Sequence, residues 1–227
     1  MAVALDTSDR NEYMRWCRLF GRRVGVLKVG LEAFCRWGPW VFQEACDQPS
    51  RVFADLKLHD IPNTVGQAVR AIRDQGVDYL TVHSAGGTAM LEAAALSAVE
   101  DLTLLAVTVL THLDEKALVE LDLPGDASTR ALDWARLASS AGCRGAVCSS
   151  REVAALRRDL GKEFVLVTPG IRPPGYHKDD QRRTASPAEA LAAGSNLLVI
   201  GRPLTRAADP DRALDALESA ITLGPNA

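Results

Sequence analysis

The chain has 227 residues, of which 47% are hydrophobic and 24% are charged, a balance typical of a folded globular protein. A formal net charge of −3 argues against nucleic-acid-binding and membrane-surface functions, although a local cluster of basic residues could still bind one phosphate. The five cysteines are odd in number and include no C-x-x-C pair, which disfavours a disulfide framework or a zinc site and favours a reducing compartment. We find no secretory signal and no apolar stretch long enough to cross a bilayer, so we expect a cytoplasmic protein.

Short apolar runs alternate with longer amphipathic stretches along the whole chain. The runs are rich in Val, Leu and Ile, which is typical of buried parallel strands. In chain order they cover residues 2–5, 24–29, 51–56, 79–82, 102–107, 145–148, 164–167 and 197–200. Alternating strands and helices imply a parallel sheet, and about eight such units favour a closed (β/α)8 TIM barrel. We therefore expect an α/β protein with a single catalytic domain over residues 1–227.

Apolar spacing and caps place several of the intervening helices. Residues at helical spacing form three apolar stripes: Val65, Ala68, Val69 and Ile72; Val153, Leu156 and Leu160; and Leu214, Leu217 and Ile221. Ser186 and Glu189 have the spacing of a capping box, with Pro187 at the first helical position. Asp9 and Glu12 have the same spacing near the start of the chain.

One connection, residues 170–185, is polar, contains Gly and Pro, and is long for a link between a strand and its helix. Such loops often act as lids over a bound ligand. A solvated surface loop fits the same polarity equally well.

Polar side chains follow most of the predicted strands at their carboxyl ends, where barrel enzymes place their chemistry. We expect these side chains to gather at one end of the barrel. They are Asp6, Lys28, Asp55, Lys57, Asp60, His83, Thr108, Thr111, Gly201 and Arg202.

The third predicted strand ends in two charged residues of opposite sign. Asp55 and Lys57 share one strand face, because side chains alternate, and in a barrel that face points inward. Buried charges are tolerated when they are paired, and Lys28 on the neighbouring strand can pair with Asp55. The pattern predicts an interleaved array of Lys28, Asp55, Lys57 and Asp60. Taken alone, it is explained about as well by a structural cluster of ion pairs.

The eighth strand is followed by a candidate phosphate site. Gly201 permits close approach of the backbone, and Arg202 offers a bidentate fork for phosphate oxygens. Pro203 suits the first turn of a helix, whose N-terminus attracts anions. These residues favour a phosphorylated ligand without identifying it.

A ten-residue string, Asp55-x-Lys57-x-x-Asp60-Ile61-Pro62-Asn63-Thr64, resembles the highly specific signature of the orotidine 5′-monophosphate decarboxylases. Further motifs similar to those of the family occur in its order over nearly the whole chain. They are Ala4-Leu5-Asp6, Leu27-Lys28-Val29-Gly30, Val82-His83, Val109-Leu110-Thr111, Thr168-Pro169-Gly170-Ile171-Arg172-Pro173, Asp180-Gln181-Arg182-Arg183 and Val199-Ile200-Gly201-Arg202-Pro203. The Asp180–Arg183 segment resembles the bacterial branch.

The resemblance implies an enzyme that removes CO₂ from C6 of orotidine 5′-monophosphate without a cofactor or metal, the last step of de novo UMP synthesis. Lys57 would donate the proton to C6, Asp55 would lie beside the substrate carboxylate, and Lys28 and Asp60 would hold the array. The substrate-binding residues that it implies are Asp6, Lys28, Ile61, Thr64, Thr111, Arg172, Gln181, Gly201 and Arg202. It also implies a homodimer with shared active sites, in which the Asp60–Thr64 segment reaches the partner's site, and a phosphate-gripping lid at 170–185.

Two other functions remain open from the sequence. A magnesium-dependent sugar-phosphate decarboxylase or aldolase of the same barrel superfamily has a similar D-x-K-x-x-D array, but the Asp60–Thr64 string and Gln181 oppose it. A non-catalytic phosphate- or nucleotide-binding barrel is opposed by the intact Lys28, Asp55, Lys57 and Asp60. No set of His, Asp and Glu has metal-ligand spacing, and His83 receives no catalytic role because a structural hydrogen bond explains it at least as well.

Overall fold

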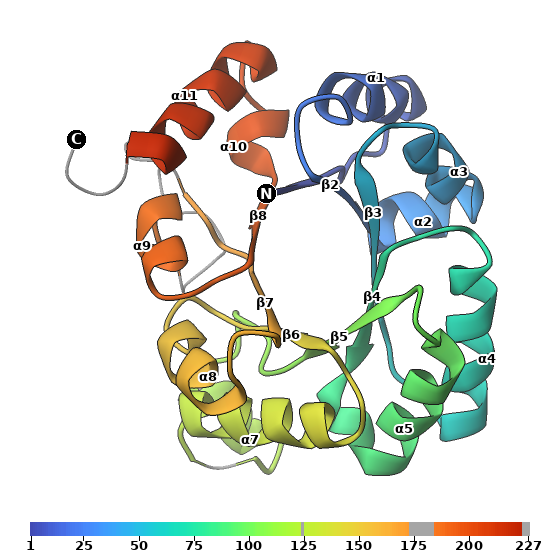
Figure 1. The fold of residues 1–227 in the computed structure, drawn as a ribbon, viewed down its shortest axis with the longest axis vertical. Helices are drawn as coiled ribbons and strands as arrows, with labels where there is room; N and C mark the ends of the chain where they lie inside the picture. The colour runs from blue at the N-terminus through green and yellow to red at the C-terminus, as the bar shows by residue number, and fades with distance from the viewer. Residues whose placement is uncertain (124, 173–183, 224–227) are drawn as a thin grey trace.

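The computed structural model describes residues 1–123, 125–172 and 184–223, and for residues 222 and 223 it describes the backbone alone. The described residues form eight parallel strands that close into a barrel in chain order, and the helices surround it (Figure 1). This confirms the predicted (β/α)8 fold, and each predicted strand lies within two residues of the observed bounds. The strands are β1 (Ala2–Ala4), β2 (Val26–Gly30), β3 (Arg51–Leu58), β4 (Tyr79–His83), β5 (Thr103–Val107), β6 (Gly145–Val147), β7 (Val165–Thr168) and β8 (Leu197–Ile200).

Helices connect the strands around the outside of the barrel. In the described part of the chain they are α1 (Arg10–Phe20), α2 (Leu31–Trp37), α3 (Trp40–Cys46), α4 (Pro62–Arg73), the 3₁₀ turn η1 (Ser84–Gly86), α5 (Gly87–Ala98), α6 (Glu115–Glu120), α7 (Ala127–Ser140), α8 (Val153–Leu160), α9 (Pro187–Ala192), α10 (Arg202–Thr205) and α11 (Pro210–Leu223). None of these helices is both long enough and apolar enough to span a membrane.

The predicted helix starts are confirmed, with one difference at α1. Ser186 and Glu189 form a reciprocal capping box at α9. Asp9 caps α1 through the amides of residues 11 and 12, but the Glu12 carboxylate accepts from the Thr7 hydroxyl at 2.6 Å instead of from the Asp9 amide. The Thr7 hydroxyl in turn accepts from the Asp9 amide at 3.1 Å, so Thr7 lies between the two groups that a capping box joins directly.

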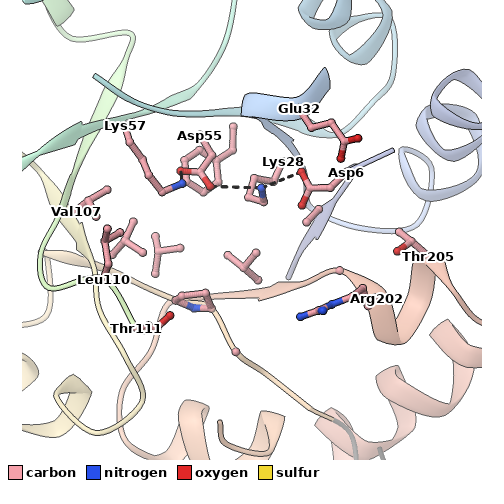
Figure 2. Close-up of a pocket in the computed structure, with 18 of the residues that line it drawn as sticks. Asp6, Lys28, Glu32, Asp55, Lys57, Val107, Leu110, Thr111, Arg202 and Thr205 are labelled. Atoms are coloured by element: carbon pink, nitrogen blue, oxygen red, sulfur yellow. Dashed lines mark hydrogen bonds and ion pairs between the residues drawn. The ribbon is translucent and has the colours of Figure 1, made fainter. Parts of the chain in front are cut away.

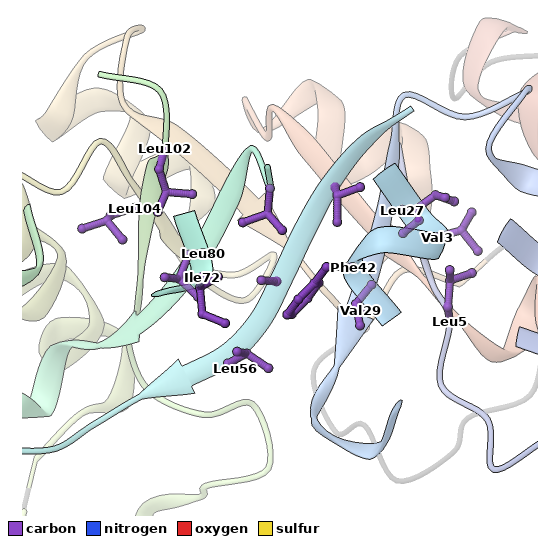
Figure 3. Packing of buried hydrophobic residues seen from close by; sticks show 14 of the residues in the cluster. Val3, Leu5, Leu27, Val29, Phe42, Leu56, Ile72, Leu80, Leu102 and Leu104 are labelled. Atoms are coloured by element: carbon purple, nitrogen blue, oxygen red, sulfur yellow. The ribbon is translucent and has the colours of Figure 1, made fainter. Parts of the chain in front are cut away.

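Two apolar layers form the core and leave one end of the barrel for polar residues. Side chains that alternate outward from the strands pack against the helices (Figure 3); they include Val3, Leu27, Leu56, Leu80 and Leu104. A smaller cluster fills the barrel interior and comes from the first or third residues of the strands: Ala2, Val26, Phe53, Leu105, Val167 and Leu197. Inward-facing positions nearer the carboxyl ends remain for the charged residues.

Strand β3 is irregular at the point where its charged residues stand. Ala54 pairs with Leu80 of β4, but the next pair is Leu58 with Val82, so β3 advances four residues while β4 advances two. Within this irregularity Lys57 has a φ of 50°, in the left-handed region that residues other than glycine rarely occupy. The local distortion changes the direction of the backbone at Lys57, while the Asp55 side chain still points into the barrel.

Candidate active site

A cavity of about 690 Å³ opens at the carboxyl ends of the strands (Figure 2). Asp6 after β1, Lys28 in β2, and Asp55 and Lys57 in β3 line one side of it, and Arg202 after β8 lines another. The expectation that polar strand-end residues gather at one end of the barrel is therefore met for these five side chains. The cavity has the size of a small-molecule site.

Four of the charged side chains form a continuous chain of alternating sign. The Lys57 ammonium lies 2.8 Å from Oδ1 of Asp55, and the Lys28 ammonium lies 3.4 Å from Oδ2 of the same carboxylate. Lys28 also lies 3.6 Å from Oδ1 of Asp6 (Figure 2). The observed order is thus Asp6, Lys28, Asp55, Lys57: Asp6 extends the array at its Lys28 end, whereas the sequence placed Asp60 at its Lys57 end.

Both buried members of this array remain charged. Burial opposes the charge of Lys28, but Asp55 and Asp6 outweigh burial and raise the pKa of Lys28. Burial likewise opposes the charge of Asp55, but Lys28 and Lys57 outweigh it and lower the pKa of that carboxyl group. Each ion is therefore stabilised by neighbours of opposite sign, which is the condition for keeping charges inside a protein.

Gly30 makes room for the array at the end of β2. A Cβ atom at this position would lie 2.5 Å from Oδ1 of Asp6 and 3.1 Å from the Lys28 ammonium. The Gly30 backbone is extended, so an alanine would be strained by these side chains and not by its own φ and ψ. Gly30 is part of a sequence motif, but the sequence alone did not indicate this role.

Thr81 is a further neighbour of the array that the sequence analysis missed. Its hydroxyl lies 3.0 Å from Oδ1 of Asp55 and accepts a hydrogen bond from the Lys57 amide at 2.8 Å. Thr81 stands in the middle of β4 and is fully buried. Thr81 lies between two outward-facing residues, Leu80 and Val82. This alternation is the only sequence signal that directs its side chain into the barrel.

The segment from Asp60 to Thr64 lies apart from the array of its own chain. Asp60, Ile61 and Thr64 are exposed and do not line the cavity, and Oδ1 of Asp60 accepts from the Ile61 amide at 2.6 Å. The structure therefore does not bring Asp60 together with Lys28, Asp55 and Lys57 within one chain. Its assignment to the site of a partner subunit stays a prediction.

The predicted phosphate-binding residues lie on the other side of the cavity. Gly201 and Arg202 line it, together with Thr205, which was not predicted, and Figure 2 shows Arg202 across the cavity from Lys57. Pro203 lies in the first turn of α10 as expected, but this helix has only four residues, so its dipole adds little to the attraction of an anion. Arg202 and Arg206, which both line the cavity, give this side its positive charge.

Thr111 and Arg172 also line the cavity, as predicted. Arg172 begins the 170–185 connection, whose described ends are joined by a bridge between Ile171 and Ala185 and by the Arg172 amide, which donates to the Ala185 carbonyl at 2.9 Å. Gln181, predicted to bind the substrate, lies outside the described residues. The cavity wall is apolar around Val107, Leu110 and their neighbours Val109, Val147, Val167 and Val199.

His83 has structural partners. Its Nδ1 accepts from the Ala85 amide at 3.2 Å and so caps η1, and its ring stacks on His59 with centroids 5.3 Å apart. Burial, together with the nearby charge on His59 and Lys57, lowers the pKa of His83. His83 does not line the cavity. Across the described residues, no group of three or more His, Cys, Asp and Glu side chains is placed to hold a metal ion.

Comparison with known proteins gives one consistent result. The model of the orotidine 5′-phosphate decarboxylase / HUMPS family matches residues 1–217. Proteins named orotidine 5′-phosphate decarboxylase from Moorella thermoacetica and Thermobifida fusca are each 46% identical to this chain; the matches cover 97% of it and 91% and 95% of those proteins. The crystal structure of orotidine 5′-phosphate decarboxylase from Lactobacillus acidophilus superposes with a TM-score of 0.82 at 32% identity, covering 100% of this chain and 99% of that one.

Proposed function

The chain belongs to the orotidine 5′-phosphate decarboxylase / HUMPS family, and we propose that it converts orotidine 5′-monophosphate to UMP and CO₂ without a cofactor. The observation that carries this proposal is the array Asp6, Lys28, Asp55 and Lys57, which faces a cavity with Arg202 on its other side. A nucleoside monophosphate has its reacting base and its phosphate at opposite ends, so this distribution of charge matches it. The high identity to proteins named for this activity supports the same conclusion.

Lys57 is the proposed proton donor. When the bond from C6 to the carboxylate breaks, its electron pair stays on C6, and the carboxylate leaves as neutral CO₂. The Lys57 ammonium stabilises the negative charge that develops on C6 and then transfers a proton to it, becoming a neutral amine. An ammonium held 2.8 Å from Asp55 before the substrate arrives needs little reorganisation to perform both tasks.

Asp55 has two proposed roles. It holds the Lys57 and Lys28 ammonium groups in place, and it lies beside the substrate carboxylate, where two like charges favour departure of CO₂. The apolar wall around Val107 and Leu110 suits a neutral leaving molecule better than an anion. Departure of CO₂ removes the charge that this part of the cavity solvates poorly.

The remaining proposed contacts bind the ribose and the phosphate. Asp6 and Lys28 bind ribose hydroxyls, with Thr111 and Gly201 at the cavity wall. Arg202 binds the phosphate, and the 170–185 connection adds Arg172 and Gln181 as a lid. The exposure of Ile61, 65% of its surface, supports a role for the Asp60–Thr64 segment in a partner's site, with Asp60, Ile61 and Thr64 as contributors. The proposed enzyme is therefore a homodimer, and its five unpaired cysteines fit a cytoplasmic location.

A parallel substrate test separates this proposal from the related magnesium-dependent function. One sample of purified protein receives orotidine 5′-monophosphate, and another receives a phosphorylated keto sugar with Mg²⁺. Formation of UMP in the first sample, identified by mass spectrometry, supports the proposal. Conversion of the sugar phosphate alone would contradict the proposal and indicate the function of the metal-dependent relatives.

A further inference from the structure

Thr81 links the backbone amide of Lys57 to the Asp55 carboxylate, which also binds the Lys57 ammonium directly. The Lys57 amide donates to the Thr81 hydroxyl at 2.8 Å, and this hydroxyl lies 3.0 Å from Oδ1 of Asp55. The same Oδ1 accepts from the Lys57 ammonium at 2.8 Å. The three residues thus form a closed ring of hydrogen bonds that contains the backbone and the head group of Lys57.

The irregularity in β3 explains why a side chain is needed here. Between the pairs Ala54–Leu80 and Leu58–Val82 the regular ladder is interrupted, and Lys57 takes a φ of 50°. A buried amide without an acceptor costs a large part of a hydrogen bond. The Thr81 hydroxyl supplies that acceptor in place of a backbone carbonyl, so it stabilises the unusual conformation of Lys57.

The direction of the Thr81 hydroxyl follows from its chemistry. A hydroxyl has one proton, and its oxygen is already the acceptor for the Lys57 amide. The proton is therefore free to point at Oδ1 of Asp55, which as a carboxylate can only accept. This bond favours the charged form of Asp55 and contributes to the lowering of its pKa.

We propose that Thr81 is a positioning residue for the decarboxylation, which aims the Lys57 ammonium by holding its backbone and the Asp55 carboxylate in one hydrogen-bonded ring. The inference rests on the proposed function. It assigns Thr81 no contact with the substrate, since Thr81 is fully buried and does not line the cavity. The effect of Thr81 on the reaction passes through the placement of Lys57 and Asp55.

The test compares Thr81→Ser with Thr81→Ala, two variants that both lack the γ-methyl group and differ only in the hydroxyl. Thr81→Val, which keeps the shape and loses the hydroxyl, is the second comparison. Thr108→Val is the matched control, because Thr108, like Thr81, is a fully buried threonine, but its hydroxyl donates to the Val147 carbonyl and not to a residue of the array. Folding of each variant is checked by circular dichroism before kinetics.

We expect kcat to fall by roughly tenfold to a hundredfold in Thr81→Ala and Thr81→Val, the effect of one hydrogen bond to a charged group, with KM changed by less than about threefold. Thr81→Ser should recover most of kcat, and Thr108→Val should stay close to the wild type. The acidic limb of the kcat profile should move to higher pH in Thr81→Ala and Thr81→Val but not in Thr81→Ser, because only the first two remove a donor to Asp55. Equal kcat in Thr81→Ser and Thr81→Ala, or an equal loss in Thr108→Val, would overturn the inference.

Hydrogen exchange of the Lys57 amide gives a second readout that does not depend on turnover. It should be faster in Thr81→Ala than in Thr81→Ser, because only the serine retains an acceptor for that amide. If the wild-type protein did not decarboxylate orotidine 5′-monophosphate, the proposed function would fail while this exchange still reported on the ring. Unchanged exchange in Thr81→Ala would reject the role of Thr81 even in an active enzyme.

Discussion

The Lys57 ammonium donates to Oδ1 of Asp55 at 2.8 Å, although only Leu56 separates the two residues along β3. Leu56 points outward into the apolar layer beneath the helices, so the two charged side chains share the inward face. Lys57 is thereby held in the cavity before any ligand binds. This arrangement places a cation where the proposed reaction develops negative charge.

Replacement of Lys57 by alanine should abolish turnover and leave the fold intact. We expect kcat/KM to fall by at least about a thousandfold, because the variant loses both the proton donor and the cation beside C6. Steady-state kinetics and thermal unfolding check the two parts of the prediction. Lys162→Ala, at an exposed position, is the control. An equal loss of stability and activity would instead indicate that Lys57 belongs to a structural ion pair.

The acid dependence of stability should reflect Asp55. Its folded pKa is held below the ordinary value of 3.8, so the stabilisation is complete above that value and is lost as the pH falls through the folded pKa. Between about pH 5 and about pH 2, the free energy of unfolding should fall less steeply in Asp55→Asn than in the wild type. Urea denaturation at several pH values measures the slopes. A slope unchanged from that of the wild type would show that Asp55 is not paired in the folded state; Asp101→Asn, at an exposed site, controls for generic loss of charge.

Gly30 should tolerate no side chain. In Gly30→Ala the new Cβ must displace the Asp6 carboxylate and crowd the Lys28 ammonium, so we expect activity to fall by about a hundredfold and stability by about 1–3 kcal/mol. Gly25→Ala is a matched control, since a Cβ there meets nothing nearer than the Met1 carbonyl oxygen at 3.9 Å. Kinetics and chemical denaturation of the two variants suffice. Equal behaviour of both would mean that the array adapts freely to the added methyl group.

Arg202 should act only on substrates that carry a phosphate. Loss of one charge-assisted contact in Arg202→Ala should lower kcat/KM for orotidine 5′-monophosphate by roughly tenfold to a hundredfold. On orotidine, which lacks the phosphate, the variant and the wild type should be equally slow. Initial rates at high enzyme concentration measure both substrates. The same proportional loss on orotidine would assign Arg202 a role other than phosphate binding.

Shared active sites can be tested by mixing two inactive variants. If Asp60 serves the partner's site, a hybrid dimer of Lys57→Ala and Asp60→Asn contains one intact site and one doubly altered site. After subunit exchange of equal amounts, activity should recover to about a quarter of the wild-type value, because about half of the dimers are hybrids with one working site. No recovery after verified exchange would place Asp60 and Lys57 in the same site or leave Asp60 without a role.

The sequence predicted the barrel and most of the array because both depend on simple periodicity. Apolar strand runs located all eight strands, and the alternation of side chains placed Asp55 and Lys57 on one inward face. The roles of Gly30 and Thr81 were not predictable, because each depends on which residues of neighbouring strands stand side by side. The left-handed backbone of Lys57 had no signal either, since lysine is not a residue that favours a positive φ.

Asp60 shows a different limit of sequence reasoning. Its spacing from Asp55 and Lys57 suggested one array, but β3 ends at Leu58 and the chain then leaves the barrel interior before α4 begins at Pro62. Asp6 lies two residues after Ala4, the last residue of β1, and it reaches Lys28 because β1 and β2 are paired with Ala4 opposite Lys28. Proximity across strands therefore decided which acidic residue joined the array.

Loss of the orotate absorbance from orotidine 5′-monophosphate, followed in the presence of a strong chelator, tests the proposed reaction most directly. We expect the absorbance to fall at the same rate with and without chelator, and UMP to form in equal amount. Such a result would establish the substrate, the reaction and its independence of an added metal together. A correctly folded protein that left the absorbance unchanged, or that lost activity until Mg²⁺ was restored, would contradict the proposed function.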